Sequence, residues 1–142
     1  MTDSSLLNQL LSDLNGEDKH KARYAAFRLS QIEGDQALSG LIDALKHKDS
    51  EVRTIVAQTL SSKGDEAIPS LLGALQDRSR NVRRAAARSL GIIGGAEVLN
   101  GLVGTLLGDE NSFVRWEAAK ALGSMDQAGV IPELLEALSA DS

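Results

Sequence analysis

The sequence predicts an all-α solenoid, in which pairs of short helices stack along one axis. Three observations predict it: the composition, an internal repeat, and apolar positions at helical spacing. Aromatic residues are only 3% of the 142 residues, and Ala and Leu supply most of the 42% that are hydrophobic. This bias favours close-packed helices over a sheet, because strands are rich in aromatic and β-branched residues. The length allows one domain with a buried core.

One motif recurs along the chain with a period of about 31 residues. It consists of Val followed by Arg, then an apolar pair, and then Leu eight positions after the Val. The copies begin at Val52, Val82 and Val114, and they reach Leu60, Leu90 and Leu122. A weaker copy precedes them, in which Lys21 takes the place of Val and Ala22 the place of Arg. We interpret it as an atypical terminal repeat.

A second motif, Leu-Leu-x-x-Leu or a close variant, precedes each copy of the first. Its apolar residues at i, i+1 and i+4 line one face of a helix, so each repeat is predicted to be two short amphipathic helices. Breaks rich in Gly, Asp, Asn and Ser separate these helices, as at Gly64-Asp65 and Gly94-Gly95. One helix pair cannot bury its own apolar face, whereas stacked pairs share a continuous core.

The pattern Val-Arg-x-x-Ala-Ala-x-x-Leu-Gly, with its preceding Leu-Leu-x-x-Leu helix, resembles HEAT repeats. It is most similar to the short PBS-lyase HEAT-like subfamily, named after phycobilisome bilin lyase subunits, and the resemblance extends from Leu6 to Leu138. It implies a right-handed α-solenoid of four HEAT-like helix pairs plus a C-terminal capping helix, in a single domain of residues 1–142. The expected repeats are approximately 5–35, 36–66, 67–97 and 98–129, and the expected final helix is 130–139.

The resemblance also implies a structural role for one arginine in each of the three clear repeats. These arginines are Arg53, Arg83 and Arg115, and acids of the turns such as Asp49, Asp77 and Asp109 are candidate partners. One Arg at a fixed place in each clear repeat is what a structural ladder between neighbouring turns requires. We therefore favour this role over one in ligand binding.

The second helices also expose a set of aromatic, basic and polar side chains. At 100° per residue, these positions point away from the core. In similar solenoids the second helices line the concave surface, so we expect a partner-binding face there. Its residues are Arg23, Tyr24, Phe27, Thr54, Gln58, Arg84, Arg88, Trp116 and Lys120. Aromatic and Arg side chains are the usual anchors of interfaces. The alternative is that Phe27 and Trp116 pack against the terminal repeats as caps.

No catalytic constellation is visible in the sequence. Cysteine is absent, and the two histidines, His20 and His47, have no convincing third ligand for a metal. No nucleophile elbow is present, and the run Gly91–Gly95 reads as a helix stop rather than a phosphate loop. We therefore expect no catalytic residues, no metal and no stand-alone enzyme, with any lyase role exercised only as part of a complex.

The function favoured by this sequence is a protein–protein interaction scaffold. The first alternative, suggested by the subfamily name, is an accessory or lyase-like subunit in phycobilisome or bilin handling. In that case Arg84, Arg88 and Lys120 would pair with the propionates of a bilin, and Trp116 would stack on its rings. Without a bilin, we expect no cofactor.

The second alternative is nucleic-acid binding through a cluster of five arginines. The cluster comprises Arg78, Arg80, Arg83, Arg84 and Arg88. The formal net charge of −5 argues against it, since non-specific nucleic-acid binding needs a basic footprint.

Further expectations concern the localisation of the protein and its C-terminal helix. Residues 1–14 lack a basic region followed by a long apolar run, and no stretch approaches the roughly 18 apolar residues of a membrane span. We therefore expect a cytoplasmic protein without a membrane partner. The apolar residues Leu134, Leu135 and Leu138 need cover on one side, which leaves open a natural cap, a longer array, or self-association through the C-terminal helix.

Overall fold

The computed structural model describes residues 4–125, and all regular structure among them is helical, which confirms the all-α fold. The elements are α1 (Ser4–Leu14), α2 (Lys19–Ser30), α3 (Asp35–Asp43), η1 (Ala44–Lys46), α4 (Ser50–Thr59), η2 (Leu60–Ala67), α5 (Ile68–Ala74), α6 (Arg80–Ile93), α7 (Ala96–Gly108) and α8 (Ser112–Met125). The expected final helix, 130–139, lies outside the described residues.

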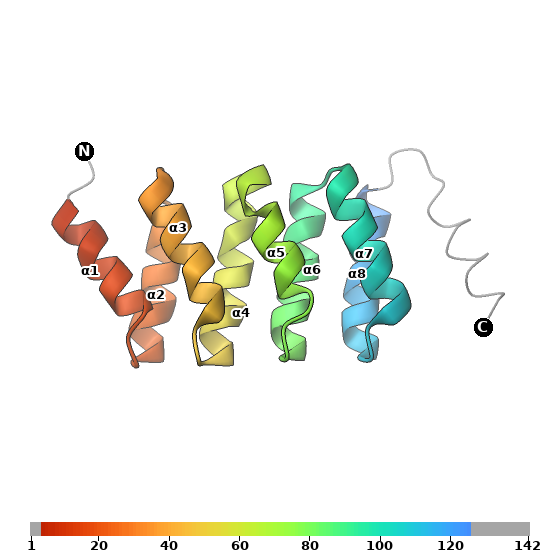
Figure 1. Ribbon diagram of the computed structural model, residues 1–142, viewed down its shortest axis with the longest axis horizontal. Coiled ribbons are helices and arrows are strands. Elements are labelled where there is room, and N and C mark those ends of the chain that lie inside the picture. The colour runs from red at the N-terminus through yellow and green to blue at the C-terminus, as the bar shows by residue number, and fades with distance from the viewer. Residues whose placement is uncertain (1–3, 126–142) are drawn as a thin grey trace.

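The helices form two layers that run along the long axis of the molecule (Figure 1). The first helix of each pair, α1, α3, α5 or α7, lies in the layer nearer the viewer, and the second helices α2, α4, α6 and α8 lie behind. Helix α2 packs against α4, α4 against α6, and α6 against α8. Helices α2, α6 and α8 also pack against the first helix of their own pair, whereas α4 contacts η1, the short 3-10 helix that follows α3. This is the stacking expected when consecutive pairs share one core.

The repeated apolar residues form that core. The motif valines Val52, Val82 and Val114 are fully buried, and the leucine that ends each motif, such as Leu90, is also buried. Small residues let the second helices approach closely. At Gly91 in α6, an added Cβ would lie 2.6 Å from the Cβ of Ala121 in α8, closer than two carbon atoms can pack.

Side-chain caps define where three of the second helices begin. Asp18 accepts hydrogen bonds from the amides of His20 and Lys21, and Asp49 accepts one from Glu51. The backbone N–H of Lys21 lowers the pKa of Asp18, and the backbone N–H of Glu51 lowers the pKa of Asp49. At α8, Asn111 accepts from the amides of Phe113 and Val114. By contrast, Ser79 at the start of α6 forms no such bond.

Glycines with positive φ make the sharp turns between successive pairs. Gly34 (φ 112°), Gly64 (φ 68°), Gly94 (φ 76°) and Gly95 (φ 111°) adopt conformations that are costly for other residues. The Gly94-Gly95 turn stops α6 at Ile93, where the sequence indicates a helix stop. These turns reverse the chain so that the next first helix returns to the front layer.

Candidate functional site

A buried arginine in α4 links two successive helix pairs at the edge where each first helix turns into its second. Arg53 donates from Nε to Asp77 at 3.0 Å and from a terminal nitrogen to the second carboxylate oxygen of Asp77 at 3.2 Å. The same guanidinium donates to the backbone carbonyl of His47 at 2.8 Å. Arg53 thus joins the turn of its own pair to the turn of the next pair with a nearly buried bidentate ion pair.

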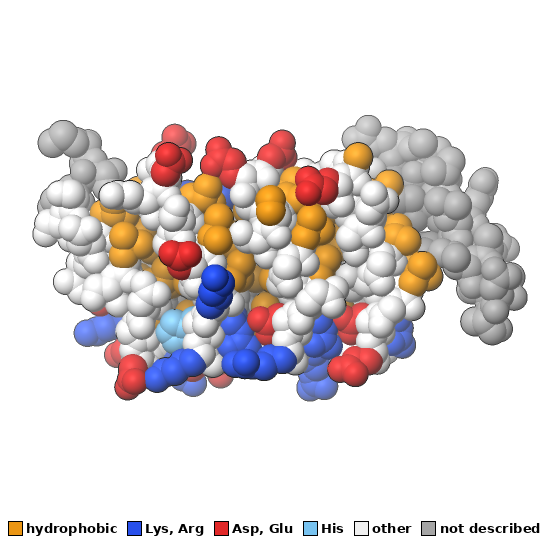
Figure 2. Space-filling model, viewed as in Figure 1, with side chains coloured by type: hydrophobic (Ala, Val, Ile, Leu, Met, Phe, Trp, Pro, Cys, Tyr) orange, Lys and Arg blue, Asp and Glu red, His pale blue; other side chains and the backbone are white. Residues whose placement is uncertain are grey.

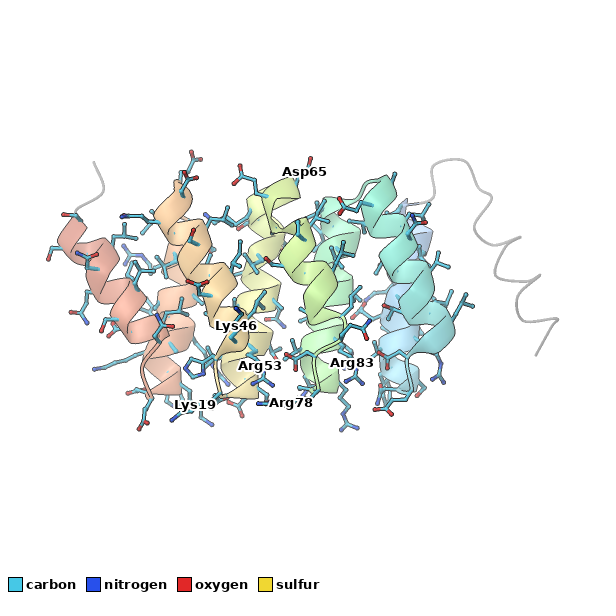
Figure 3. All side chains as sticks on the ribbon, viewed as in Figure 1. Lys19, Lys46, Arg53, Asp65, Arg78 and Arg83 are labelled. Carbon is cyan, nitrogen blue, oxygen red and sulfur yellow. The ribbon has the colours of Figure 1, made fainter. Side chains whose placement is uncertain are left out.

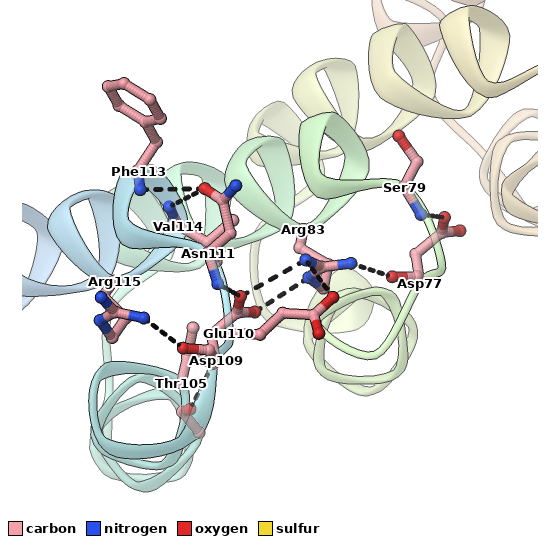
Figure 4. Close-up of polar contacts among 11 residues, drawn as sticks. Asp77, Ser79, Arg83, Thr105, Asp109, Glu110, Asn111, Phe113, Val114 and Arg115 are labelled. Carbon is pink, nitrogen blue, oxygen red and sulfur yellow. Dashed lines mark hydrogen bonds and ion pairs between the residues drawn. The ribbon is translucent and has the colours of Figure 1, made fainter.

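Arg83 repeats this arrangement one pair further along. Its Nε donates to Asp109 at 2.9 Å, and a terminal nitrogen donates to the carbonyl of Asp77 at 2.8 Å (Figure 4). The two arginines lie in equivalent places along the same edge of the molecule (Figure 3). We call this set of contacts the turn ladder, with Arg53, Arg83 and Arg115 as its arginines. Arg115 donates to the carbonyl of Asp109 at 2.7 Å, and the residues following α8 lie outside the described part.

The first helix pair lacks this contact and has a different one. Ala22 stands where the other repeats have Arg, and His47 stands where the later turns have Asp77 and Asp109. The Nδ1 of His47 accepts the amide N–H of Asp49 at 3.0 Å, so Nε2 carries the proton and donates to the carbonyl of Gly16 at 3.1 Å. His47 is therefore a structural residue of the turn ladder rather than an exposed loop histidine.

The solvent-facing side of the second-helix layer forms the second notable region. We define the second-helix face as the side chains two, five, six and nine positions after each N-cap, a spacing that keeps them on one side of a helix. They are His20, Arg23, Tyr24 and Phe27 on α2, Glu51, Thr54, Ile55 and Gln58 on α4, Asn81, Arg84, Ala85 and Arg88 on α6, and Phe113, Trp116, Glu117 and Lys120 on α8. All nine residues expected to bind a partner belong to this face.

A pocket of about 270 Å³ opens in the middle of the second-helix face. Its lining residues are Arg23, Glu51, Thr54, Ile55, Gln58, Asn81, Arg84, Ala85, Arg88 and Glu117. Of the nine expected residues, the structure brings five together here, namely Arg23, Thr54, Gln58, Arg84 and Arg88. The other four, Tyr24, Phe27, Trp116 and Lys120, lie outside the pocket on the two terminal second helices.

The arginines of the pocket keep unused hydrogen-bond donors. Arg23 binds Glu51 at 2.7 Å, yet its buried Nε has no acceptor. The buried Nε of Arg84 has none either. Arg88 is exposed and forms no ion pair with any residue in the range 4–125. The guanidinium of Arg88 is accessible and has no acidic partner among the described residues, so the pocket favours a ligand that supplies acceptors.

Glu117 is a buried carboxylate at the edge of this pocket. It is only 4% exposed, whereas the sequence pattern places it beside the exposed positions. The ammonium of Lys120 lies 3.0 Å from its Oε2, but the geometry is not that of a hydrogen bond. Ala85, the equivalent residue in α6, is also buried. Burial at this position arises because it faces the neighbouring second helix rather than solvent.

Four exposed aromatic side chains flank the pocket, two on α2 and two on α8. Tyr24, Phe27, Phe113 and Trp116 are between 54% and 62% exposed, which weighs against the capping alternative for Phe27 and Trp116. Lys120 lies 4.6 Å from the centroid of the Trp116 ring, and Arg84 lies 5.8 Å from that of Phe113. Phe113 is absent from the set expected from sequence, although its place three residues before Trp116 could have indicated it.

The other groups singled out by sequence lie in separate places. The five clustered arginines divide between the turn ladder (Arg83), the pocket (Arg84 and Arg88) and exposed positions at the start of α6 (Arg78 and Arg80). Within residues 4–125, no group of three or more His, Cys, Asp or Glu side chains is arranged to hold a metal ion. Over the same range, no helix combines the length and apolar character needed to cross a membrane.

Charge is distributed unevenly between the two edges of the molecule. Figure 2 shows acidic side chains along the edge where one pair passes to the next, and basic side chains interspersed with acidic ones along the opposite edge with the turn ladder. Asp65 lies on the acidic edge, and Lys19 and Arg78 lie on the other (Figure 3). The second-helix face lies on the side away from the viewer in these figures.

The repeats, the two-layer stack and the turn ladder together define a helical-repeat protein. A family profile of HEAT repeats matches residues 5–79, 61–106 and 71–142, so the chain belongs to the HEAT-repeat family. No match was found among curated proteins.

Solved structures share this fold. Human deoxyhypusine hydroxylase in complex with glycerol is similar with a TM-score of 0.77 and 24% identity, over 85% of this chain and 43% of the hydroxylase chain. This chain therefore spans less than half the length of that relative. The complex of CpcE and CpcF of phycocyanin lyase from Nostoc sp. PCC7120 is similar with a TM-score of 0.68 and 22% identity, over 96% of this chain and 91% of the matched chain. An engineered protein is similar with a TM-score of 0.56 and 28% identity, over 87% of this chain and 64% of the engineered chain. These likenesses support the fold.

Proposed function

We propose that this protein is an interaction scaffold that binds a partner protein on the second-helix face. The observation that carries the proposal is the combination of exposed aromatic rings with a pocket whose arginines have unused donors. Aromatic and Arg side chains dominate the binding energy of protein interfaces, and a rigid helical stack holds them in fixed positions. Membership of the HEAT-repeat family supports an interaction role of this kind.

Affinity capture with matched variants tests this proposal. The wild-type protein, a Trp116→Ala/Arg84→Ala variant and an Arg78→Gln/Arg80→Gln control are immobilised and exposed to an extract of the source organism. We expect a protein that is retained by the wild type and the control and lost with the face variant. Retention by the face variant, equal loss with the control, or no retained protein would contradict the proposal.

Bilin handling is the second candidate function. It is supported by the similarity to the CpcE and CpcF complex over most of both chains, and by cations and an aromatic ring on one face. Arg84, Arg88 and Lys120 would pair with bilin propionates, and Trp116 would stack on the conjugated rings. Binding would change the visible absorption of an added bilin and quench the fluorescence of Trp116. An unchanged spectrum at saturating protein would exclude this candidate.

Nucleic-acid binding is less favoured, because the five clustered arginines do not form one surface. Arg83 is committed to the turn ladder, and the remaining four lie in two separate regions. A nucleic-acid site needs cations that follow a phosphate backbone together.

A further inference from the structure

We propose that the second-helix face binds an extended protein segment of about nine residues that is acidic in its centre and apolar at both ends. This inference rests on the proposed scaffold function and specifies the chemistry of the partner. It follows from three features of the face: the charge of its central pocket, the position of its aromatic rings, and its length.

The central pocket favours carboxylate groups. Three arginines line it against two glutamates, and Glu51 and Glu117 already have cationic partners in Arg23 and Lys120. Arg84 and Arg88 form no ion pair within residues 4–125, and they stand one helical turn apart on α6. Their guanidinium groups can each bind a carboxylate with two parallel hydrogen bonds, the geometry that Arg forms best.

Neutral polar side chains in the same pocket suit the backbone of an extended segment. Gln58 and Asn81 line the pocket, and within the described residues neither side chain has a hydrogen-bond partner of its own. An extended chain exposes unpaired N–H and C=O groups that such amides can satisfy. The interior of a partner helix would offer no such backbone groups, because its own hydrogen bonds occupy them.

Aromatic rings at both ends of the face favour apolar anchors. Tyr24 and Phe27 lie on α2, and Phe113 and Trp116 lie on α8, so a ring pair stands on each side of the pocket. All four rings are more than half exposed. Exposed aromatic side chains gain the most from burial against apolar residues of a partner.

The spacing of the helices sets the length of the segment. Helix α2 is separated from α8 by three steps between neighbouring second helices, through α4 and α6. Packed helices lie about 8–10 Å apart, so the two ring pairs are separated by roughly 24–30 Å. An extended chain advances about 3.3 Å per residue, which corresponds to about nine residues.

The rest of the molecule makes this face selective for acidic segments. The protein has a formal net charge of −5, so its overall charge opposes the approach of an acidic chain, which can bind only where unpaired cations gather. Repulsion elsewhere and attraction at one pocket together give specificity.

Selection from a random twelve-residue peptide library displayed on phage tests the inference on the full chain. The dissociation constants of enriched peptides are then measured by fluorescence anisotropy with the wild type, an Arg84→Gln/Arg88→Gln variant and the Arg78→Gln/Arg80→Gln control. Both variants remove the same charge, and neither breaks an ion pair within the described residues. Trp116 is the only tryptophan, so its fluorescence reports directly on binding at one end of the face.

We expect enriched peptides with central Asp or Glu and apolar residues toward both ends. Their affinity should fall at least about tenfold with Arg84→Gln/Arg88→Gln, equivalent to one charge-assisted hydrogen bond, and should not change with the control. Replacing the central carboxylates of a peptide by amides should give a similar loss, and Trp116→Ala should weaken only peptides with apolar ends.

Two other outcomes separate this inference from the scaffold proposal. Peptides that depend on the face but are neutral or basic would overturn the acidic-segment inference and leave the scaffold proposal standing. Peptides that bind equally well to the face variants, or no enriched peptides, would overturn both. Concentration-dependent self-association that is lost with Arg84→Gln/Arg88→Gln would show that the face binds a second copy, and would also overturn the inference.

Discussion

Arg83 and Arg84 are adjacent in the sequence, yet they belong to regions with opposite properties. Arg83 lies in the turn ladder, where its side chain is 10% exposed and its charge is matched by a nearly buried Asp109. Arg84 lies on the second-helix face, where it forms no ion pair within the described residues and covers an aromatic ring. One step of 100° around a helix therefore separates an arginine that holds the stack together from one available to a partner.

The largest expected effect breaks the ladder at Arg83. Arg83→Ala should lower the free energy of unfolding by about 3–5 kcal/mol, because it leaves the carboxylate of Asp109 buried without its partner. Arg84→Ala is the matched control and should change stability by less than about 0.5 kcal/mol, since no ion pair is lost. Urea denaturation followed by circular dichroism measures both. Equal effects would contradict the division between the two regions.

The second effect tests the packing that sets the spacing of the second-helix face. Gly91→Ala places a methyl group against Ala121 where there is no room, and should cost about 1–3 kcal/mol. Gly104→Ala in α7 meets no atom within 4 Å and should instead stabilise by up to about 1 kcal/mol through helix propensity. Thermal unfolding of the two variants compares them. Stabilisation by Gly91→Ala would show that α6 and α8 can separate at little cost.

The third effect extends the ladder to the first helix pair. Ala22→Arg and His47→Asp together introduce the pair that Arg53 and Asp77 form one repeat later. In a double-mutant cycle, we expect the two changes to couple favourably by about 0.5–3 kcal/mol, since they would be in direct contact. Each single change should destabilise, because it introduces an unpaired charge at a buried or half-buried position. Additive effects would show that the ladder geometry does not extend to this pair.

The smallest effect distinguishes the helix caps by pH. Since the pKa values of Asp18 and Asp49 are lower in the folded protein than their ordinary value of 3.8, these caps stabilise it above that pH. Their contribution is lost as the pH falls through the lowered values, because the unfolded chain then binds protons first. The stability difference between wild type and Asp18→Asn/Asp49→Asn should therefore shrink in acid. Ser79→Ala should show no such pH dependence.

The fold was accessible from sequence because its determinants repeat. Val52, Val82 and Val114 recur with one period, and each is buried in the same way, so the helix pairs and their core follow from alignment alone. The breaks were also visible, since Gly64 and Gly94 stand where the chain must adopt positive φ.

Details of the site depend on neighbouring helices that the alignment does not place. The sequence proposes Asp49, Asp77 and Asp109 as partners for the arginines. The position of each helix pair relative to the next decides which carboxylate an arginine contacts, and the first two arginines of the turn ladder each contact the acid in the turn of the following pair. Asp49 caps α4 instead. Glu117 shares its repeat position with Tyr24, yet one is buried and the other exposed, because α8 packs against the preceding second helix, α6, and within the described residues no second helix precedes α2.

The ladder contacts run from each helix pair to the next one along the chain, so the junctions between successive pairs differ in how easily they separate. Each of Arg53 and Arg83 reaches toward the following pair through a nearly buried ion pair, whereas the first pair is joined to the second by hydrogen bonds from His47 and Lys63 to backbone carbonyls and by ion pairs that are largely exposed. Exposed ion pairs contribute little, so opening at the N-terminal junction costs less than opening at either of the next two. Of the three described junctions, the first should therefore open most readily, and amide hydrogens of α1 and α2 should exchange before those of α6.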